Sequence, residues 1–222
     1  MNEILFLIEI VLAFGSVVLI SRYIGKAGLF AWMAGAVIIA NLVVAKQITV
    51  FGIGATLGNV AFASTYLVTD ILNELYGFKE SRKAVYCTLI GAGLFVGTAF
   101  LSVRFIPNEL DFIQNSLSDV LAISTRVTIA SVVALYCSNL CDVYIYEKLK
   151  QKIPGKMWLR NNVSTVLCNC TENFLLTYLG FYGILSGMEC FWLSVTTSIV
   201  ETLIAFCDTP FLYLAKRLGR PR

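Results

Sequence analysis

Long apolar runs, separated by short stretches rich in basic residues, dominate the pattern of the chain. Seven runs hold about 20 mostly apolar residues each, the length that an α-helix needs to cross the hydrocarbon core of a bilayer. Because the connections between them are short, the pattern predicts an all-α integral membrane protein that forms one polytopic domain over residues 1–222. The seven predicted transmembrane helices cover roughly residues 4–21, 28–46, 55–76, 83–104, 122–146, 161–185 and 190–214.

The basic residues predict how this bundle is oriented. Of the 17 Lys and Arg residues, 14 fall in the first, third and fifth connections and in the C-terminal tail. Because cytoplasmic loops of membrane proteins are rich in Lys and Arg, we expect the N-terminus outside and the C-terminus in the cytoplasm. The protein is then a multi-pass protein of a cell membrane, most simply the bacterial plasma membrane. The fourth connection, residues 107–121, has apolar residues at near-helical spacing and predicts a short interfacial helix.

Composition narrows the classes of function. The chain is 58% apolar and 14% charged, whereas a soluble domain is about 45–50% apolar and about 25% charged. This difference excludes a soluble enzyme and a nucleic-acid-binding domain. The chain has no His and no G-x-x-x-x-G-K-[ST] loop, and its seven Cys residues form no C-x-x-C pair. We therefore expect no cofactor, no resident metal ion and no nucleic-acid partner. The lipid bilayer and a small molecule remain as partners, as for a transporter rather than an enzyme.

Four of the predicted helices carry polar residues at helical spacing, several of them acidic. A carboxylate at the centre of a bilayer costs about 2.5–3.5 kcal/mol and is rarely without a function. Because a helix surrounded by lipid has no use for a polar face, we expect the four faces to converge on one polar, acidic cavity. The polar positions are Asn59, Tyr66, Asp70 and Glu74 in the third helix, Ser131, Ser138 and Asp142 in the fifth, Asn161, Thr165, Asn169 and Glu172 in the sixth, and Ser194, Ser198, Glu201 and Asp208 in the seventh.

Plainer interpretations of these residues stay open. The hydroxyl residues among them can simply join helices through hydrogen bonds. Three of the acids lie near cytoplasmic helix ends, where a Lys can pair with each of them: the acids are Glu74, Asp142 and Asp208, and the Lys residues are Lys79, Lys148 and Lys216. Gly54 and Gly58 predict either close helix packing or a partly unwound start of the third helix.

Several ordered blocks resemble one known family. Residues 64–77, STYLVTDILNELYG, resemble the T-D-I-L-x-E-x-Y-G signature of the YhhQ-type queuosine precursor transporters, also called the vitamin uptake transporter family. Residues 41–46 resemble the early Asn-containing helix of that family. Further similar blocks are Arg126 to Lys150, Trp158 to Thr165 with its W-x-R-x-N-x-S-T pattern, and Asp208-Thr209-Pro210.

The resemblance implies import of a 7-deazaguanine base for salvage into modified tRNA: 7-cyano-7-deazaguanine, 7-aminomethyl-7-deazaguanine or queuine. A guanine-type edge presents two N–H donors side by side, and a carboxylate accepts both in a fork. Asp70 or Glu172 suits this role, and Asn41 or Asn169 can donate to the exocyclic oxygen. Rings that can stack on the base are Phe62, Tyr66, Tyr136, Phe174 and Tyr178. The candidate substrate-binding residues are Asn41, Tyr66, Asp70, Glu74, Asp142, Asn169, Glu172 and Glu201.

Three of these positions depart from the family pattern. Glu172 stands where the family usually has Asp, Asn169 where Gln is common, and Glu201 where Lys is expected. The departures make the predicted cavity more acidic and favour a base that carries a protonated amine.

The expected architecture is one extra N-terminal helix, residues 1–25, and a transporter core, residues 26–216. The core would consist of two inverted three-helix halves with the site between them, a common plan among carriers. The alternatives are a substrate-binding subunit of an energy-coupling-factor importer, which needs an ATPase partner, and a membrane-embedded enzyme. A homodimer is also compatible with the sequence.

Overall fold

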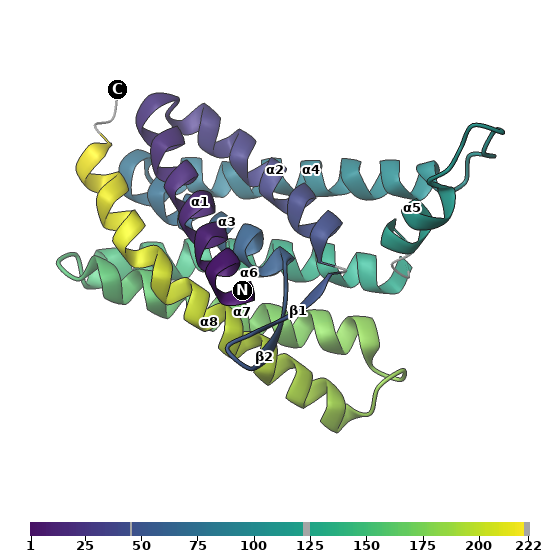
Figure 1. Cartoon of the computed structure of the whole chain (residues 1–222). Coiled ribbons are helices and arrows are strands. Elements are labelled where there is room, and N and C mark those ends of the chain that lie inside the picture. Colours follow the sequence, from purple (N-terminus) through teal and green to yellow (C-terminus); the bar gives the residue numbers. More distant parts are fainter. Residues whose placement is uncertain (45, 122–124, 220–222) are drawn as a thin grey trace.

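Seven long helices joined by short connections make up most of the fold in the computed structural model, which describes residues 1–44, 46–121 and 125–219 (Figure 1). Ala45, residues 122–124 of the predicted fifth span and tail residues 220–222 lie outside the described residues. The prediction of a helical membrane protein is confirmed. The elements are α1 (Asn2–Tyr23), α2 (Lys26–Val43), β1 (Gln47–Val50), β2 (Ile53–Thr56), α3 (Gly58–Tyr76), α4 (Phe78–Ser102), α5 (Gln114–Leu121), α6 (Thr125–Lys152), α7 (Met157–Phe181) and α8 (Gly187–Leu218).

Five of the described helices are long and apolar enough to cross a membrane: α1, α2, α4, α6 and α8. With 19 and 25 residues, α3 and α7 extend about 28 Å and about 37 Å, so their length also suits a bilayer. Their polar residues lower the mean hydropathy of α3 and α7, which therefore fall outside this group. The number of seven spans and their orientation stay predictions.

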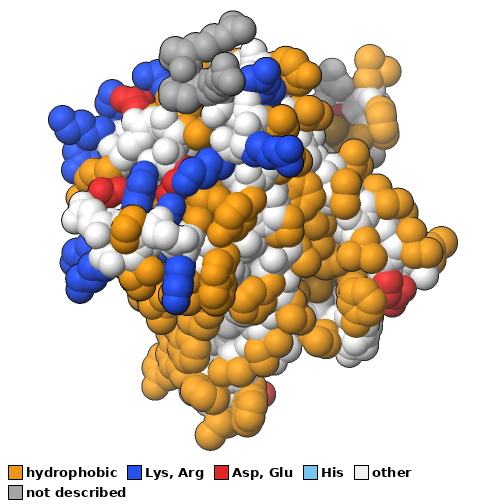
Figure 2. Space-filling view, turned by 90° about the vertical axis from the view of Figure 1, so that its left-hand side faces the viewer, with side chains coloured by type: hydrophobic (Ala, Val, Ile, Leu, Met, Phe, Trp, Pro, Cys, Tyr) orange, Lys and Arg blue, Asp and Glu red, His pale blue; other side chains and the backbone are white. Residues whose placement is uncertain are grey.

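The surface of the molecule is apolar over wide areas. On α1 alone, six large hydrophobic side chains are more than half exposed: Ile4, Leu5, Val11, Leu12, Leu19 and Tyr23. Apolar patches of this extent are unusual on soluble proteins and mark contact with lipid or a partner. Figure 2 shows Lys and Arg gathered in one part of the face in view and apolar side chains over much of the rest. This surface is that of a helical membrane protein with one basic end.

α3 lies inside the bundle, and α7 packs one face against two other helices. α3 packs against α1, α2, α4, α6 and α8, and α1 crosses in front of it in Figure 1. Of the 19 residues of α3, 14 are buried. α7 packs against α6 and α8 and buries 12 of its 25 residues. Because these helices face protein, their polar side chains can bond to one another rather than meet lipid.

The connection between α2 and α3 holds a small β-hairpin in addition to the predicted helices. β1 and β2 pair antiparallel, and Val50 faces Ile53 across a turn formed by Phe51 and Gly52. Both turn residues have positive φ angles, 51° and 77°, as the two-residue turns of hairpins require. Gly54 thus belongs to a strand, whereas Gly58 begins α3. A Cβ atom at Gly58 would lie 2.9 Å from the Ala40 carbonyl oxygen of α2, so the close-packing interpretation holds for Gly58.

The connections from α3 to α4, from α6 to α7 and from α7 to α8 are short. Gly77 alone joins α3 to α4, with a φ of 87° that strains any residue with a side chain. Ser186 and Glu189 form a capping box that begins α8. The short interfacial helix predicted within residues 107–121 is present as α5. The polar face of α3 in the centre thus meets the buried face of α7.

Candidate functional site

Polar side chains from α3, α6, α7 and α8 meet inside the bundle, as the sequence predicts. Tyr66, Asp70 and Glu74 follow one another at intervals of one helical turn along α3. Each of them lies at the centre of a different group of contacts with the other three helices. We name each group after its α3 residue. The Tyr66 layer also holds Ser138, Glu172 and Glu201, the Asp70 layer holds Asp142 and Asp208, and the Glu74 layer holds Tyr146, Arg160 and Lys216.

The Glu74 layer is a network of ion pairs. The Glu74 side chain is only 3% exposed and accepts from the Arg160 guanidinium of α7. Lys216 of α8 donates to the same carboxylate at 2.9 Å, and the Tyr146 hydroxyl of α6 donates at 3.0 Å. Lys150 of α6 lies 3.9 Å from it. One carboxylate of α3 thus joins three other helices. Glu74 pairs with cations, as the sequence left open, but among the described residues these include Lys216 and not the neighbouring Lys79.

Arg160 corrects the sequence-based interpretation. The charge pattern assigns it to a cytoplasmic connection, but it lies in the first turn of α7 and is 2% exposed. Its guanidinium also donates to the Pro154 carbonyl at 2.9 Å and lies 5.5 Å from the ring centroid of Tyr146. Its place inside the W-x-R-x-N-x-S-T block was the signal that it has a specific role.

The Asp70 layer brings three carboxyl groups together. Asp70 of α3, Asp142 of α6 and Asp208 of α8 are 0%, 0% and 1% exposed. The Thr69 hydroxyl donates to Asp142 at 3.1 Å, and the Asn161 amide donates to Asp208 at 2.6 Å. Within the described ranges 1–44, 46–121 and 125–219, no ion pair reaches these three carboxyl groups. The Asp142–Lys148 and Asp208–Lys216 pairs that the sequence left open are therefore absent from this part of the chain.

The Tyr66 layer combines hydroxyl, amide and carboxylate groups. The Tyr66 hydroxyl is hydrogen-bonded to Ser138 of α6 and donates to Glu172 of α7. The Asn173 amide donates to Glu201 of α8 at 2.6 Å. Glu201 lies close enough to Glu172 for their charges to repel each other. Neutral donors therefore surround the two carboxylates of this layer.

Asn169 lies on the same helix as Glu172, one turn before it. It is 2% exposed, and its side-chain NH2 group has no acceptor within the described residues. A buried amide donor without an acceptor costs free energy, about 1–3 kcal/mol, which a ligand can recover by accepting from it. Asn169 and Glu172 therefore offer a donor and an acceptor side by side.

Seven of the eight predicted site residues lie in or beside the three layers, and one does not. Asn41 belongs to none of the three layers defined above; its amide donates at 2.8 Å to the Val37 carbonyl of its own helix α2. The sequence reasoning passed over three residues that complete the layers: Tyr146, Asn161 as a partner of Asp208, and Asn173. The structure places seven predicted residues on the buried faces described above: Tyr66, Asp70, Glu74, Asp142, Asn169, Glu172 and Glu201.

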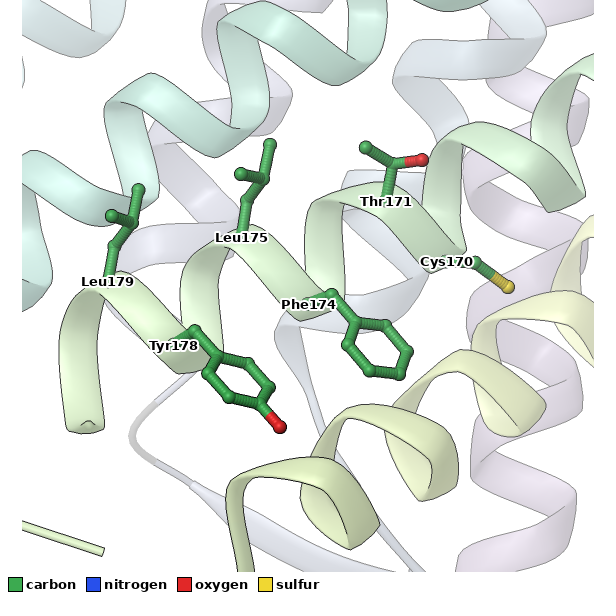
Figure 3. Close-up of a pocket in the computed structure, with 6 residues that line it drawn as sticks. All are labelled: Cys170, Thr171, Phe174, Leu175, Tyr178 and Leu179. Carbon is green, nitrogen blue, oxygen red and sulfur yellow. The ribbon is translucent and has the colours of Figure 1, made fainter. Parts of the chain in front are cut away.

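Two hollows lie away from the acidic residues. The first runs along α7, and Figure 3 shows its lining side chains on that one helix, with Phe174 and Tyr178 on the same side. Their rings stack with centroids 6.2 Å apart. The second, a small apolar hollow, lies between α4 and α6 beside Leu135 and Tyr136. The polar faces converge as predicted, but neither hollow is the predicted acidic cavity.

Comparisons with known proteins give the family. Residues 56–215 match the family described as "Putative vitamin uptake transporter". The "Probable queuosine precursor transporter" of Bacillus subtilis is 32% identical over 207 residues, which cover 91% of this chain and 89% of the relative.

More distant relatives have similar names. The "Queuosine precursor transporter" of Escherichia coli is 22% identical over 64% of this chain and 62% of the relative. A "Probable queuosine precursor transporter" of Haemophilus influenzae is 24% identical over 60% of this chain and 54% of the relative. No solved structure matches the chain. The matched family and the apolar helices together show that the chain is a multi-pass membrane protein and belongs to the vitamin uptake transporter family.

Proposed function

We propose that the protein imports a queuosine precursor, a 7-deazaguanine base, across the bacterial plasma membrane and catalyses no reaction. The names of three relatives support this function. The polar interior between α3, α6, α7 and α8 supports a polar solute as cargo. In this proposal α1, within residues 1–25, is an extra helix, and residues 26–216 form the transporter core as two inverted halves.

The pair formed by Asn169 and Glu172 carries the proposal. The edge of a guanine-type base presents a carbonyl oxygen next to a ring N–H and an exocyclic amine. The free Asn169 amide matches the carbonyl oxygen, and the Glu172 carboxylate matches the two N–H donors. Tyr66 orients Glu172 through its hydroxyl group. Glu201 adds negative charge beside this carboxylate.

The first experiment is uptake. Cells that cannot synthesise deazaguanines are supplied with labelled 7-cyano-7-deazaguanine or 7-aminomethyl-7-deazaguanine, with and without the gene for this protein. We expect label to accumulate, and modified tRNA to form, only with the gene. Equal accumulation without the gene would reject the proposal. A separate experiment tests for partners: copurification of an ATPase, or of a second copy of the chain, would identify a protein that works together with this one.

The second experiment tests the anchor. Glu172→Gln removes a charge-assisted bond worth about 1.5–3 kcal/mol, so we expect about 10- to 150-fold weaker binding of the base to purified protein. Glu109→Gln makes the same chemical change at an exposed position and should bind like the wild type. If Glu172→Gln folds normally and binds within threefold of the wild type, Glu172 is not the anchor, and Asp70 becomes the next candidate.

The acidic surroundings predict a preference among bases. Glu172 and Glu201 together favour a positively charged ligand over a neutral one. We expect the aminomethyl base and queuine, whose amines are protonated near neutral pH, to compete for uptake more strongly than the cyano base. Stronger competition by the cyano base would contradict this preference while leaving the transport function intact.

The proposed topology has its own test. Reporters placed after Arg222 and at Gln151 should report the cytoplasm, and a reporter at Asn115 should report the outside. The positive-inside rule is the physical basis, because 14 of 17 basic residues lie on the proposed cytoplasmic side. A cytoplasmic signal at Asn115 would contradict the arrangement of seven spans.

A further inference from the structure

Three acidic side chains from three different helices lie together in the Asp70 layer. Asp70, Asp142 and Asp208 are each at most 1% exposed. Asp142 and Asp208 both lie close enough to Asp70 for like charges to repel. An ionised carboxylate buried in a medium of low dielectric is strongly unfavourable unless a counter-charge is paired with it. Three such groups side by side cannot all keep their charge without compensation.

The hydrogen bonds of the layer leave several acceptor atoms without a donor. Both carboxyl oxygens of Asp70, Oδ1 of Asp142 and Oδ2 of Asp208 have no donor within the described residues. The Asn161 side chain independently shows the same lack of donors. The Nδ2 group of Asn161 donates to Asp208 at 2.6 Å, but its own Oδ1, in a side chain that is 0% exposed, has no donor. These carboxyl and amide groups therefore hold more acceptor atoms than bonded donors, although the Nε–H of nearby Arg160 is itself without an acceptor within the described residues.

The charges around Asp70 do not supply the missing compensation. From α6 it faces Asp142 and Tyr146, from α7 Arg160 and Cys168, from α8 Asp208, and along α3 Glu74. Arg160 is the cation of this set. Its NH groups donate to Glu74 and to the Pro154 carbonyl, which hold it in the Glu74 layer, and its Nε–H has no acceptor within the described residues.

The other helices around α3 add no charge to the core that they share with it. α4 contributes Ser81, which donates to the Thr69 carbonyl at 2.8 Å. α1 and α2 contribute apolar side chains such as Val17 and Met33. The carboxyl groups of the Asp70 layer therefore need a positive charge from outside the chain.

A proton fits this layer better than a metal ion. Among the described residues, no group of three His, Cys, Asp or Glu side chains is arranged to hold a metal. A proton neutralises one carboxylate and turns it into an O–H donor that bonds to a neighbouring acceptor, so it removes both the repulsion and the shortage of donors. We propose that Asp70, Asp142 and Asp208 form a proton-binding site in which at least one carboxyl group carries a proton in the structure described here.

Proton binding at this site can be coupled to transport. This coupling rests on the proposed transport function. The three carboxyl groups connect α3 of one proposed half to α6 and α8 of the other. A carboxylate that takes a proton from outside water forms an O–H bond and stops repelling its neighbours across the halves. When that O–H bond breaks toward cytoplasmic water, the repulsion returns. Proton binding thereby couples the packing of the halves to the pH on each side.

The experiment uses the full-length protein in lipid vesicles and labelled 7-cyano-7-deazaguanine, a probe without a charged amine. Exchange of the base at equal pH is measured first, and accumulation under an acid-outside gradient of one pH unit is then expressed relative to it. With one proton per base, the gradient supports about tenfold accumulation. We expect this ratio to be about ten in the wild type and in Glu109→Gln, and about one in Asp208→Asn.

The outcomes separate the two proposals. Exchange by the wild type without any response to the pH gradient overturns the proton site and leaves the transport function standing. A sodium gradient at constant pH that drives accumulation also overturns it. Absence of exchange in the wild type instead contradicts the proposed function for this base.

A second measurement does not depend on transport. Infrared absorption of protonated carboxyl groups is recorded for purified protein in lipid at neutral pH. We expect the signal in the wild type, undiminished in Glu109→Gln and reduced in Asp208→Asn and Asp70→Asn. A wild type without this absorption, or an absorption that both Asp variants leave intact, overturns the proton site even if a variant has lost transport.

Discussion

Glu74 and Asp70 lie one turn apart on the same helix, yet their surroundings are opposite. The Glu74 carboxylate contacts Arg160, Lys216 and the Tyr146 hydroxyl, and Lys150 lies 3.9 Å away. Asp70 is completely buried, its two oxygens have no donor in the described residues, and two further acids repel it. One carboxylate is thus neutralised by the chain itself, and the other is not.

The difference separates structural roles from functional ones. An acid with its own cations can join helices whatever the conditions outside, so the Glu74 layer is suited to hold the basic end of the bundle closed. An acid without cations changes its charge with what it binds, so the Asp70 layer is suited to respond. A carboxylate within a transmembrane bundle therefore indicates a function mainly when its counter-charge is missing.

The largest effect is expected in the Glu74 layer, where the chain itself neutralises the acid. Arg160→Met removes the most buried cation of the Glu74 layer, and breaking a buried ion pair from one side costs about 3–5 kcal/mol. We expect the free energy of unfolding in a fixed detergent to fall by about this amount. The double variant Glu74→Gln/Arg160→Met should recover part of the loss, because the Glu74 carboxylate that lost its buried partner is then replaced by a neutral amide. A single variant within about 1 kcal/mol of the wild type would show that the pair does not hold the bundle.

A smaller effect of opposite sign is expected at Asp70. Asp70→Asn keeps the size of the side chain and removes an acid that has no cation, so we expect the free energy of unfolding at pH 8 to rise by about 1–2 kcal/mol. Glu74→Gln, one turn away, is the matched variant and should destabilise the protein. Equal destabilisation by both substitutions would remove the contrast between the two layers.

The smallest effect is expected at the edge of the Glu74 layer. Lys216 contacts the same carboxylate as Arg160, but its side chain is 50% exposed. Exposed ion pairs contribute about 0–1 kcal/mol and weaken in salt. Lys216→Ala should therefore lower the unfolding free energy by less than about 1 kcal/mol, with no difference left in about 1 M salt. A loss as large as that of Arg160→Met would place Lys216 in the buried part of the network.

Much of this arrangement follows from sequence periodicity. Apolar length predicts the long helices, and the spacing of Tyr66, Asp70 and Glu74 places them on one face of α3 at successive turns. The alternation of basic connections marks one end of the bundle, and the acids of the other helices were recognisable as polar residues at helical spacing.

The remaining features depend on how the helices are rotated against one another, which periodicity within a single helix does not determine. Arg160 lies two residues after Trp158 and near a run of Lys, so it resembled a loop residue, yet the contact with Glu74 draws it into the bundle. The sequence does not predict the hairpin before α3. Its two strands have only four residues each, and their apolar residues and Gly indicate the start of the next helix instead.

The position of the two polar helices has a consequence for biosynthesis. α3 and α7 are more polar than the five helices that have the length and composition of membrane spans. Each is followed closely by an apolar helix, α4 after the single residue Gly77 and α8 after residues 182–186. In the proposed topology each polar helix therefore has to leave the translocation channel together with its apolar successor, as a helical hairpin. We therefore expect α3 to settle in the membrane only after α4 has been synthesised, and α7 only after α8.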